Sequence, residues 1–159
     1  MSKCVVARFE KVSAEEMSRN GISSLSSVLI PKRATKGSAG YDFFATERLV
    51  LPPKTSLEVS TGIKCAIEEG YVLKLYPRSS LGFKYGVCFD NSVGIIDSDY
   101  YNNQKNEGHI KVKLHNPSST TVVIEKGQAY AQGILERFFY AEEEEVVSER
   151  VGGLGSTDV

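Results

Sequence analysis

Signals for chain reversal recur along most of this sequence, and they are too closely spaced to leave room for a long helix. Pro52-Pro53 separates residues 49–51 from the run that begins at Thr55. Further along, Glu68-Glu69-Gly70 and Glu125-Lys126-Gly127 separate similar apolar runs. Turn residues spaced roughly eight to twelve residues apart are typical of an all-β sandwich or barrel. The sequence therefore predicts a mostly β fold.

The expected strands are short, and one of them alternates cleanly. Residues 109–115 place apolar side chains on one face and polar side chains on the other, which is the period of a half-buried strand. Ser13 and Glu16 have the spacing of a helix-capping box, so one short helix is expected before Gly21. Residues 138–140 are expected to close the core. The other expected strands are 4–12, 40–45, 49–51, 55–60, 63–67, 71–76, 120–124 and 128–135.

Length and charge limit what the protein can do. At 159 residues the chain has the length of one domain with a sizeable core. The formal net charge of -1 provides no basic field for nucleic acid. Three cysteines without a CxxC pair favour buried, reduced thiols and a cytoplasmic location. Neither a signal peptide nor a membrane-spanning run is expected, so we expect no membrane partner.

The character of the chain changes after residue 141. Four glutamates begin at Glu142, and such a run is typical of a solvated linker. The residues after Arg150 are too rich in glycine for a strand. They are expected either to fray or to close around an anion through backbone amides, Ser156 and Thr157, with Arg150 alongside. We therefore divide the chain into a barrel domain, 1–141, and a C-terminal arm, 142–159.

Two carboxylates stand close together in the stretch 91–100. Asp97 and Asp99 follow apolar residues, and an extended backbone would point both to one face and Tyr100 to the other. Like charges so close repel each other unless a cation or hydrogen-bond donors compensate. The pair fits a metal site, a general base or a solvated hairpin entrance. The frequency of aspartate in turns favours the hairpin when the stretch is taken alone.

A second candidate site lies at residues 77–82, between an expected strand and an expected helical turn. Arg78 has forked guanidinium donors, Ser79 and Ser80 have hydroxyls, and the first amides of a helix attract phosphate. The simpler interpretation is a serine cap beside a surface arginine. Taken alone, the stretch favours this simpler interpretation.

Five motifs stand in one order along the chain: Ala39-Gly-Tyr-Asp42, Pro77-Arg-Ser-Ser-Leu-Gly82, Gly94-Ile-Ile-Asp-Ser-Asp-Tyr100, Gly127-Gln-Ala-Tyr-Ala-Gln132 and Arg150-Val-Gly-Gly-Leu-Gly-Ser-Thr157. Together they resemble the motifs of the trimeric dUTPase family, the deoxyuridine triphosphate nucleotidohydrolases. The resemblance runs from about residue 28 to the C-terminus. The third motif is the most diagnostic of the five.

The resemblance implies both a fold and a reaction. The implied subunit is a distorted, jelly-roll-like β-barrel of the β-clip type. Three such subunits would form a homotrimer with sites at the subunit interfaces, each completed by the C-terminal arm of a neighbour. The implied reaction converts dUTP and water to dUMP and pyrophosphate, with Mg²⁺ chelated by the triphosphate.

The resemblance also implies roles in the reaction. Asp97 matches the general base, which deprotonates the water that attacks the α-phosphorus. Asp42 matches the first-motif acid, which either acts on Mg²⁺ through water or is a structural acid near the threefold axis. The phosphates would be positioned and neutralised by Mg²⁺ and by a set of polar side chains. This set is Arg78, Ser79, Ser80, Gln132 and Arg150.

The nucleoside would be recognised by residues of the third motif and by an asparagine just before it. Tyr100 matches the tyrosine that packs on the deoxyribose and leaves no room for a 2′-hydroxyl. Asn91 matches the asparagine that reads uracil, because an amide can both donate and accept against the uracil edge. Ile95 and Ile96 would add backbone contacts beside the nucleoside.

The chain departs from the family pattern in several places, among them Ala129 of the fourth motif, where the family commonly has a basic residue. Residues 101–107 lengthen the short hairpin that cups uracil, and Lys111 lies beyond them as a further candidate uracil contact. Ser80 stands where the family usually has glycine. In the arm, Leu154 replaces the phenylalanine that stacks on uracil, so a weaker lid is expected.

Two other functions stay open. Deoxycytidine triphosphate deaminases share the fold and an Arg-Ser-Ser motif, but they resemble Ile-Asp-Pro-Gly-Tyr in the third motif, where this chain has Ile-Asp-Ser-Asp-Tyr. The long hairpin and the altered arm would also suit a catalytically weak regulatory homologue that keeps the trimer. Hydrolysis of dUTP is the leading interpretation.

Overall fold

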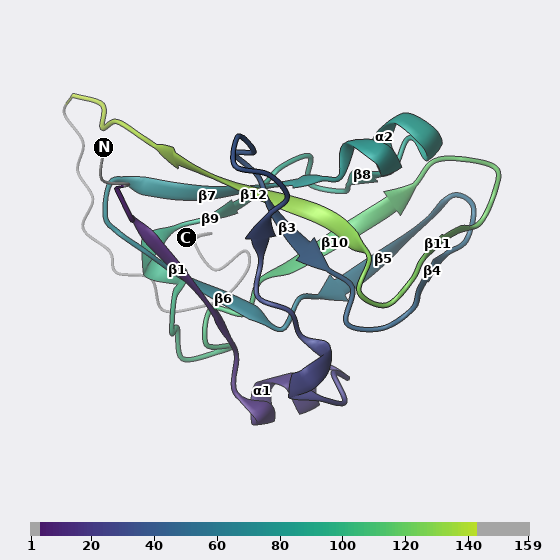
Figure 1. The fold of residues 1–159 in the computed structure, drawn as a ribbon, viewed down its shortest axis with the longest axis horizontal. Helices are drawn as coiled ribbons and strands as arrows, with labels where there is room; N and C mark the ends of the chain where they lie inside the picture. The colour runs from purple at the N-terminus through teal and green to yellow at the C-terminus, as the bar shows by residue number, and fades with distance from the viewer. Residues whose placement is uncertain (1–3, 143–159) are drawn as a thin grey trace.

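Short strands make up most of this computed structural model, which describes residues 4–142 (Figure 1). The helical elements are few and short. In chain order the elements are β1 (Ala7–Lys11), α1 (Ala14–Arg19), η1 (Leu25–Ser27), β2 (Lys32–Arg33), β3 (Tyr41–Phe44), β4 (Leu49–Leu51), β5 (Thr55–Ser60), β6 (Ile63–Ile67), β7 (Tyr71–Pro77), α2 (Ser79–Tyr85), β8 (Cys88–Phe89), β9 (Gly94–Ile96), η2 (Ser98–Tyr100), β10 (Lys111–Asn116), β11 (Val122–Ile124) and β12 (Ala129–Arg137).

The strands pair into one large antiparallel sheet and several smaller ones. The large sheet has the order β2-β3-β12-β7-β9, and β10 lies between β5 and β8 in a second sheet. Figure 1 shows β12 crossing the middle of the molecule, with α1 at one edge and the β4–β11 ribbon at another. The mostly β fold predicted from the turn spacing is confirmed, and so is its jelly-roll-like character, since consecutive strands repeatedly cross between sheets.

The alternation in residues 109–115 is confirmed by burial. Ile110, Val112 and Leu114 are buried, whereas Lys113 is exposed. β10 begins at Lys111, and just before it the Ile110 amide donates to the Ile63 carbonyl at the start of β6. The strand ends at Asn116, whose buried amide donates to the carbonyls of the following turn and of β4.

Two sequence predictions about burial are wrong. Residues 138–140 do not close the core, because β12 ends at Arg137 and the aromatic side chains lie beyond the sheet. Phe139 is 82% exposed and Tyr140 is 60% exposed. Of the three cysteines, only Cys65 is buried, and burial raises the pKa of its thiol to about 12.

The predicted helix is present, but its capping box is only half formed. The Ser13 side chain accepts a hydrogen bond from the Glu16 amide, as expected of an N-cap. The reciprocal bond from the Ser13 amide goes to Glu107 instead of Glu16. Glu16 is used elsewhere, because its carboxylate points into the interior. No helix within residues 4–142 has the length and apolarity needed to cross a membrane.

Removing the hydroxyl of Tyr130 should stabilise the fold. Tyr130 is fully buried, and its hydroxyl has no hydrogen-bond partner among the described residues. An unpaired buried hydroxyl costs about 1 kcal/mol or more. We therefore expect Tyr130→Phe to raise the free energy of unfolding in urea by about 1 kcal/mol. Tyr100→Phe is the matched control, because it loses two hydrogen bonds and should destabilise. A destabilised Tyr130→Phe would contradict the expectation.

Candidate active site

One cluster of predicted site residues forms where β3, β12 and the end of β7 meet. Asp42 lies opposite Gln132 in the β3–β12 pairing, and Gln132 lies opposite Tyr76 in the β12–β7 pairing. Arg78 follows β7 directly, and its Nη1 donates to Asp42 Oδ1 over 2.5 Å. The Asp42 side chain is 9% exposed and that of Arg78 is 33% exposed. The carboxylate therefore anchors a guanidinium that solvent or a ligand can still reach.

Gln132 is held in this cluster by its neighbours. Its Nε2 donates to the Pro77 carbonyl over 3.4 Å. Gly40 lies against its other side, since a Cβ at Gly40 would come within 2.5 Å of Gln132 Oε1. A side chain at position 40 would therefore force the Gln132 amide group to shift. We call Asp42, Arg78 and Gln132 the Arg78 cluster.

The serine-cap interpretation of residues 77–82 is wrong. The N-cap of α2 is Arg78, and it makes no side-chain capping bond. Ser79 and Ser80 are the first two residues of α2, and both are exposed. Their hydroxyls therefore lie next to the Arg78 cluster in sequence and are available to an anion.

A pocket of about 320 Å³ joins two further predicted residues, Asn91 and Lys111. It is lined by Glu58, Phe89, Asp90, Asn91, Gly94, Lys111, Val112 and Lys113. Lys111 Nζ lies 3.4 Å from a carboxylate oxygen of Glu58. A hydrogen bond from Ser56 and the nearby Lys113 ammonium lower the pKa of Asp90. Sequence reasoning missed Glu58 and Asp90, because nothing in their local pattern distinguishes them from other strand and turn acids.

The segment after β9 does not stay extended, so the prediction that Asp97 and Asp99 share a face is wrong. The Tyr100 amide donates to the Asp97 carbonyl over 3.2 Å, which closes the 3₁₀ turn η2. Asp97 is partly buried. On β9 itself the alternation holds: Ile96 is buried, whereas Ile95 is 50% exposed.

Tyr100 lies almost entirely inside the protein, 3% exposed. Its hydroxyl donates to the His109 carbonyl over 2.9 Å and accepts from Asn106 Nδ2 over 2.8 Å. The hydroxyl end is thus directed into the core. The role of Tyr100 beside a deoxyribose stays a prediction. A buried tyrosine can fill that role if one edge of its ring reaches the surface.

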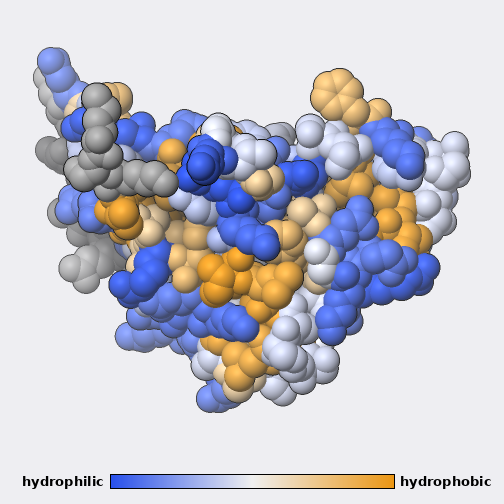
Figure 2. Space-filling model, in the orientation of Figure 1, coloured by the Kyte–Doolittle hydropathy of each residue, from blue (hydrophilic) through white to orange (hydrophobic). Residues whose placement is uncertain are grey.

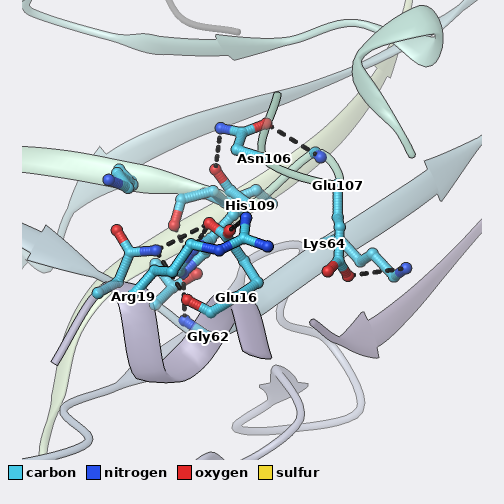
Figure 3. Close-up of polar contacts among 12 residues, drawn as sticks. Glu16, Arg19, Gly62, Lys64, Asn106, Glu107 and His109 are labelled. Atoms are coloured by element: carbon cyan, nitrogen blue, oxygen red, sulfur yellow. Dashed lines mark hydrogen bonds and ion pairs between the residues drawn. The ribbon is translucent and has the colours of Figure 1, made fainter. Parts of the chain in front are cut away.

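The residue that accepts the Tyr100 hydroxyl, His109, belongs to a buried acid–histidine pair that sequence reasoning missed. Figure 3 shows this pair of Glu16 and His109. His109 Nδ1 and Glu16 Oε1 are 3.0 Å apart, and both side chains are at most 3% exposed. The Gly62 amide donates to His109 Nε2 over 2.9 Å, so the ring proton resides on Nδ1. The sequence offered no signal for this pair, because Glu16 was expected to cap its own helix.

A single chain does not bring Asp97 to the Arg78 cluster. Ile96 pairs with Leu73, so Asp97 lies beside the first half of β7. Arg78 follows the far end of this strand, five residues beyond Leu73. At about 3.3 Å per residue, this separation amounts to roughly 17 Å along the sheet. If one reaction uses both groups, they come from different copies of the chain.

Residues of the fifth motif lie outside the described part of the chain. This applies to Arg150, Leu154, Ser156 and Thr157. Their roles stay predictions.

The Arg78 cluster offers a guanidinium to an anion. The separate pocket combines apolar walls with a few polar groups, among them the Asn91 amide, as ligand pockets do. The dUTPase family model matches residues 26–157. The deoxyuridine 5′-triphosphate nucleotidohydrolase of Lactococcus lactis is 45% identical over 130 residues, which cover 80% of this chain and 87% of that protein. The chain belongs to the dUTPase family.

Solved structures agree with this assignment. The dUTPase from Streptococcus mutans superposes with a TM-score of 0.71 at 37% identity, covering 84% of this chain and 98% of that one. A point mutant of the dUTPase from phage phi11 of S. aureus superposes with a TM-score of 0.68 at 21% identity, covering 91% and 98%. At that identity the phage protein supports the fold alone. Its structure is described as revealing the coordination of a structural Mg(II) ion.

The donor set in this chain suits a magnesium ion that arrives with a substrate. Residues 4–142 contain no group of three or more His, Cys, Asp or Glu side chains able to hold a metal. Asp42 supplies one carboxylate beside Arg78. Mg²⁺ keeps several waters and typically uses one or two carboxylates together with substrate phosphates. The Arg78 cluster therefore fits indirect contact with a phosphate-bound ion.

Acidification should destabilise the fold through His109. Burial lowers the pKa of His109 in the folded state, so the unfolded chain binds the proton more readily. The stability contributed by neutral His109 is present above the unfolded pKa of about 6.5 and is lost as the pH falls towards the folded pKa. We expect the urea midpoint of the wild type to fall between about pH 7 and about pH 5.

The histidine variants separate this effect from other acid-induced losses. His109→Asn should lower the midpoint at about pH 7 but flatten its dependence on pH. His115→Asn is the matched control, because His115 is partly exposed beside Asp90. Equal slopes for the wild type and His109→Asn would contradict the assignment.

Proposed function

We propose that this chain hydrolyses dUTP to dUMP and pyrophosphate. The observation that carries the proposal is the Arg78 cluster, in which the first, second and fourth motifs meet in a chain of the dUTPase family. In this proposal Asp97 accepts a proton from the water that attacks the α-phosphorus. The new oxygen–phosphorus bond forms as the bond to the bridging oxygen breaks, and pyrophosphate leaves.

Charge neutralisation would come from the basic and polar groups of the second and fourth motifs. Arg78 would contact phosphate oxygens while Asp42 holds its guanidinium, and Ser79, Ser80 and Gln132 would donate further hydrogen bonds. Mg²⁺ on the triphosphate would spread the negative charge, with Asp42 contacting it through water. Phosphoryl transfer depends mainly on positioning and electrostatics, which this set supplies.

Nucleoside selection would come from the pocket near Asn91. The Asn91 amide offers both a donor and an acceptor to the uracil edge, with Lys111 at the same pocket. Ile95 and Ile96 would contribute backbone contacts, and Tyr100 would exclude a 2′-hydroxyl. From the arm, Leu154 would cover the base and Arg150, Ser156 and Thr157 would contact phosphates, as the motif match implies.

We further propose a homotrimer with shared sites, in which 1–141 forms the barrel domain and 142–159 the arm that closes a neighbour's site. The separation of Asp97 from the Arg78 cluster within one chain supports this assembly. So does exposed apolar surface: Figure 2 shows apolar residues gathered between polar ones across the middle of one face. The free cysteines and the family suit an enzyme of the cytoplasm.

A nucleotide panel tests the reaction. We expect pyrophosphate release from dUTP with Mg²⁺, and much slower release from dCTP, dTTP and UTP. Asp97→Asn should lower kcat on the order of 10²- to 10⁴-fold while leaving the oligomer intact by light scattering. Ammonia release from dCTP would favour a deaminase, and full binding of dUTP without turnover would favour a regulatory homologue. Normal turnover by Asp97→Asn would remove Asp97 as the base.

Co-expression of two inactive variants tests the shared site. Asp97→Asn and Arg78→Ala should each be nearly inactive alone. In mixed trimers, about one in four neighbouring pairs would combine an intact Asp97 from one chain with an intact Arg78 from another. We therefore expect the mixed trimers to show about a quarter of the wild-type activity. The control is each variant expressed, purified and assayed by itself. No recovery in verified mixed trimers would place both groups in one chain.

A further inference from the structure

The N-terminal segment of this chain lies outside the family match but packs against the proposed catalytic loop. The dUTPase family model begins at residue 26, whereas β1 and α1 precede it. β1 pairs antiparallel with β6, from Ala7 opposite Ile67 to Lys11 opposite Ile63. β1 leads into α1 at one edge of the molecule (Figure 1), and Glu16 of α1 contacts His109.

Glu16 and Met17 are the buried residues of α1, and Glu16 is the polar one. It is 2% exposed, and its carboxylate interacts with three neighbouring side chains. Oε1 accepts from His109 Nδ1 at 3.0 Å and from Asn20 Nδ2 at 2.8 Å, and Oε2 accepts from Arg19 Nη1 at 3.2 Å. A buried carboxylate is costly unless its oxygens are paired, so these donors are needed to keep it inside.

His109 transmits this contact to the loop. Its ring is fixed at both nitrogens, by Glu16 at Nδ1 and by the Gly62 amide at Nε2. Its backbone carbonyl accepts the Tyr100 hydroxyl at 2.9 Å. The Tyr100 amide in turn bonds to the Asp97 carbonyl. A continuous series of hydrogen-bonded residues thus joins α1 to the proposed base.

A second connection fixes the inserted residues 101–107 to the same segment. Glu107 accepts from the amide and hydroxyl of Ser13, the N-cap of α1, and lies 3.7 Å from Lys64 Nζ. At the other end of the insertion, the Tyr101 hydroxyl donates to Glu10 in β1 over 2.6 Å. Both ends of the insertion are therefore attached to β1–α1 or to its partner strand.

The contacts of Tyr101 and Glu107 offset the entropy lost in ordering a longer hairpin. Ordering additional loop residues loses conformational entropy, and a catalytic group on a loop depends on its supporting contacts. The hairpin is closed by Gly108 with a φ of +80°, where a Cβ would lie 2.6 Å from the Tyr100 carbonyl. Gly108 therefore packs against the backbone of Tyr100. The hydroxyl end of Tyr100 is held by His109, which α1 contacts through Glu16.

We propose that α1 braces the active-site loop, with Glu16 and His109 as positioning residues that hold Tyr100 and Asp97 for dUTP hydrolysis. This inference rests on the proposed function. Neither residue touches the substrate in this scheme. Each acts through Tyr100, whose place beside the deoxyribose sets the preference for dUTP over UTP and whose backbone closes the turn at Asp97.

The test compares two variants on one helix. Glu16→Gln keeps the size of the side chain but places an amide group among the donors Asn20 and Arg19. We expect kcat for dUTP to fall on the order of tenfold and the dUTP-over-UTP preference to fall by a similar factor, because small misplacements of reacting groups are costly. Glu15→Gln is the matched control, since Glu15 is exposed and contacts Arg19. It should leave both quantities unchanged.

Two further variants distinguish a positioning effect of Glu16 from a general loss of stability. Ile124→Val trims the buried core of β11, away from α1, and should lower the melting temperature without changing the nucleotide preference. Glu107→Gln weakens the second connection at a partly exposed site and should lower the preference in the same direction as Glu16→Gln. All rates are normalised to active sites titrated with a non-hydrolysable dUTP analogue.

The outcomes separate this proposal from the proposed function. Wild-type protein that releases no pyrophosphate from dUTP overturns both. Active wild type with Glu16→Gln and Glu107→Gln unchanged in kcat and preference overturns the brace alone. The brace is also overturned if the Glu16 variant loses activity with an unaltered preference.

Discussion

Pairing along both edges of β12 is the constraint on which the rest of the structure depends. Its register sets Gln132 opposite Asp42 on one side and opposite Tyr76 on the other. Because side chains alternate along a strand, a slip by one residue would exchange Gln132 with the buried Ala131 and break the cluster. Backbone hydrogen bonds between β3, β12 and β7 thus bring together three motifs that are far apart in the sequence.

Other parts of the interior are organised by buried polar groups instead. Glu16, His109 and Asn116 are buried and hydrogen-bonded, and each joins segments that strand pairing alone would leave apart. Satisfied polar groups in a low-dielectric core define geometry sharply, because an alternative arrangement would leave a donor or an acceptor without a partner. The region around Tyr100 is therefore fixed by hydrogen bonding, and the region around Arg78 by strand register.

Most strands and the family could be predicted from the sequence, whereas several local contacts could not. The alternation in residues 109–115 and the turn residues between strands are short-range signals, so they predicted β10 and its neighbours well. The capping box failed in part because Glu107, 94 residues from Ser13, took the amide that Glu16 was expected to bind. Residues 138–140 looked like core by composition, but the strand before them ends at Arg137. Composition does not reveal where pairing stops.

The sequence by itself determined the all-β class, the order of the five motifs and the identity of the residues that they supply. These features depend on residue type and on periods of a few residues, which are visible in one dimension. Tertiary structure alone decided that Arg78 faces Asp42, that Asp97 lies far along β7 from both, and that α1 reaches His109. Those relations arise from register and from buried polar pairing between distant segments, for which a single sequence carries no local signal.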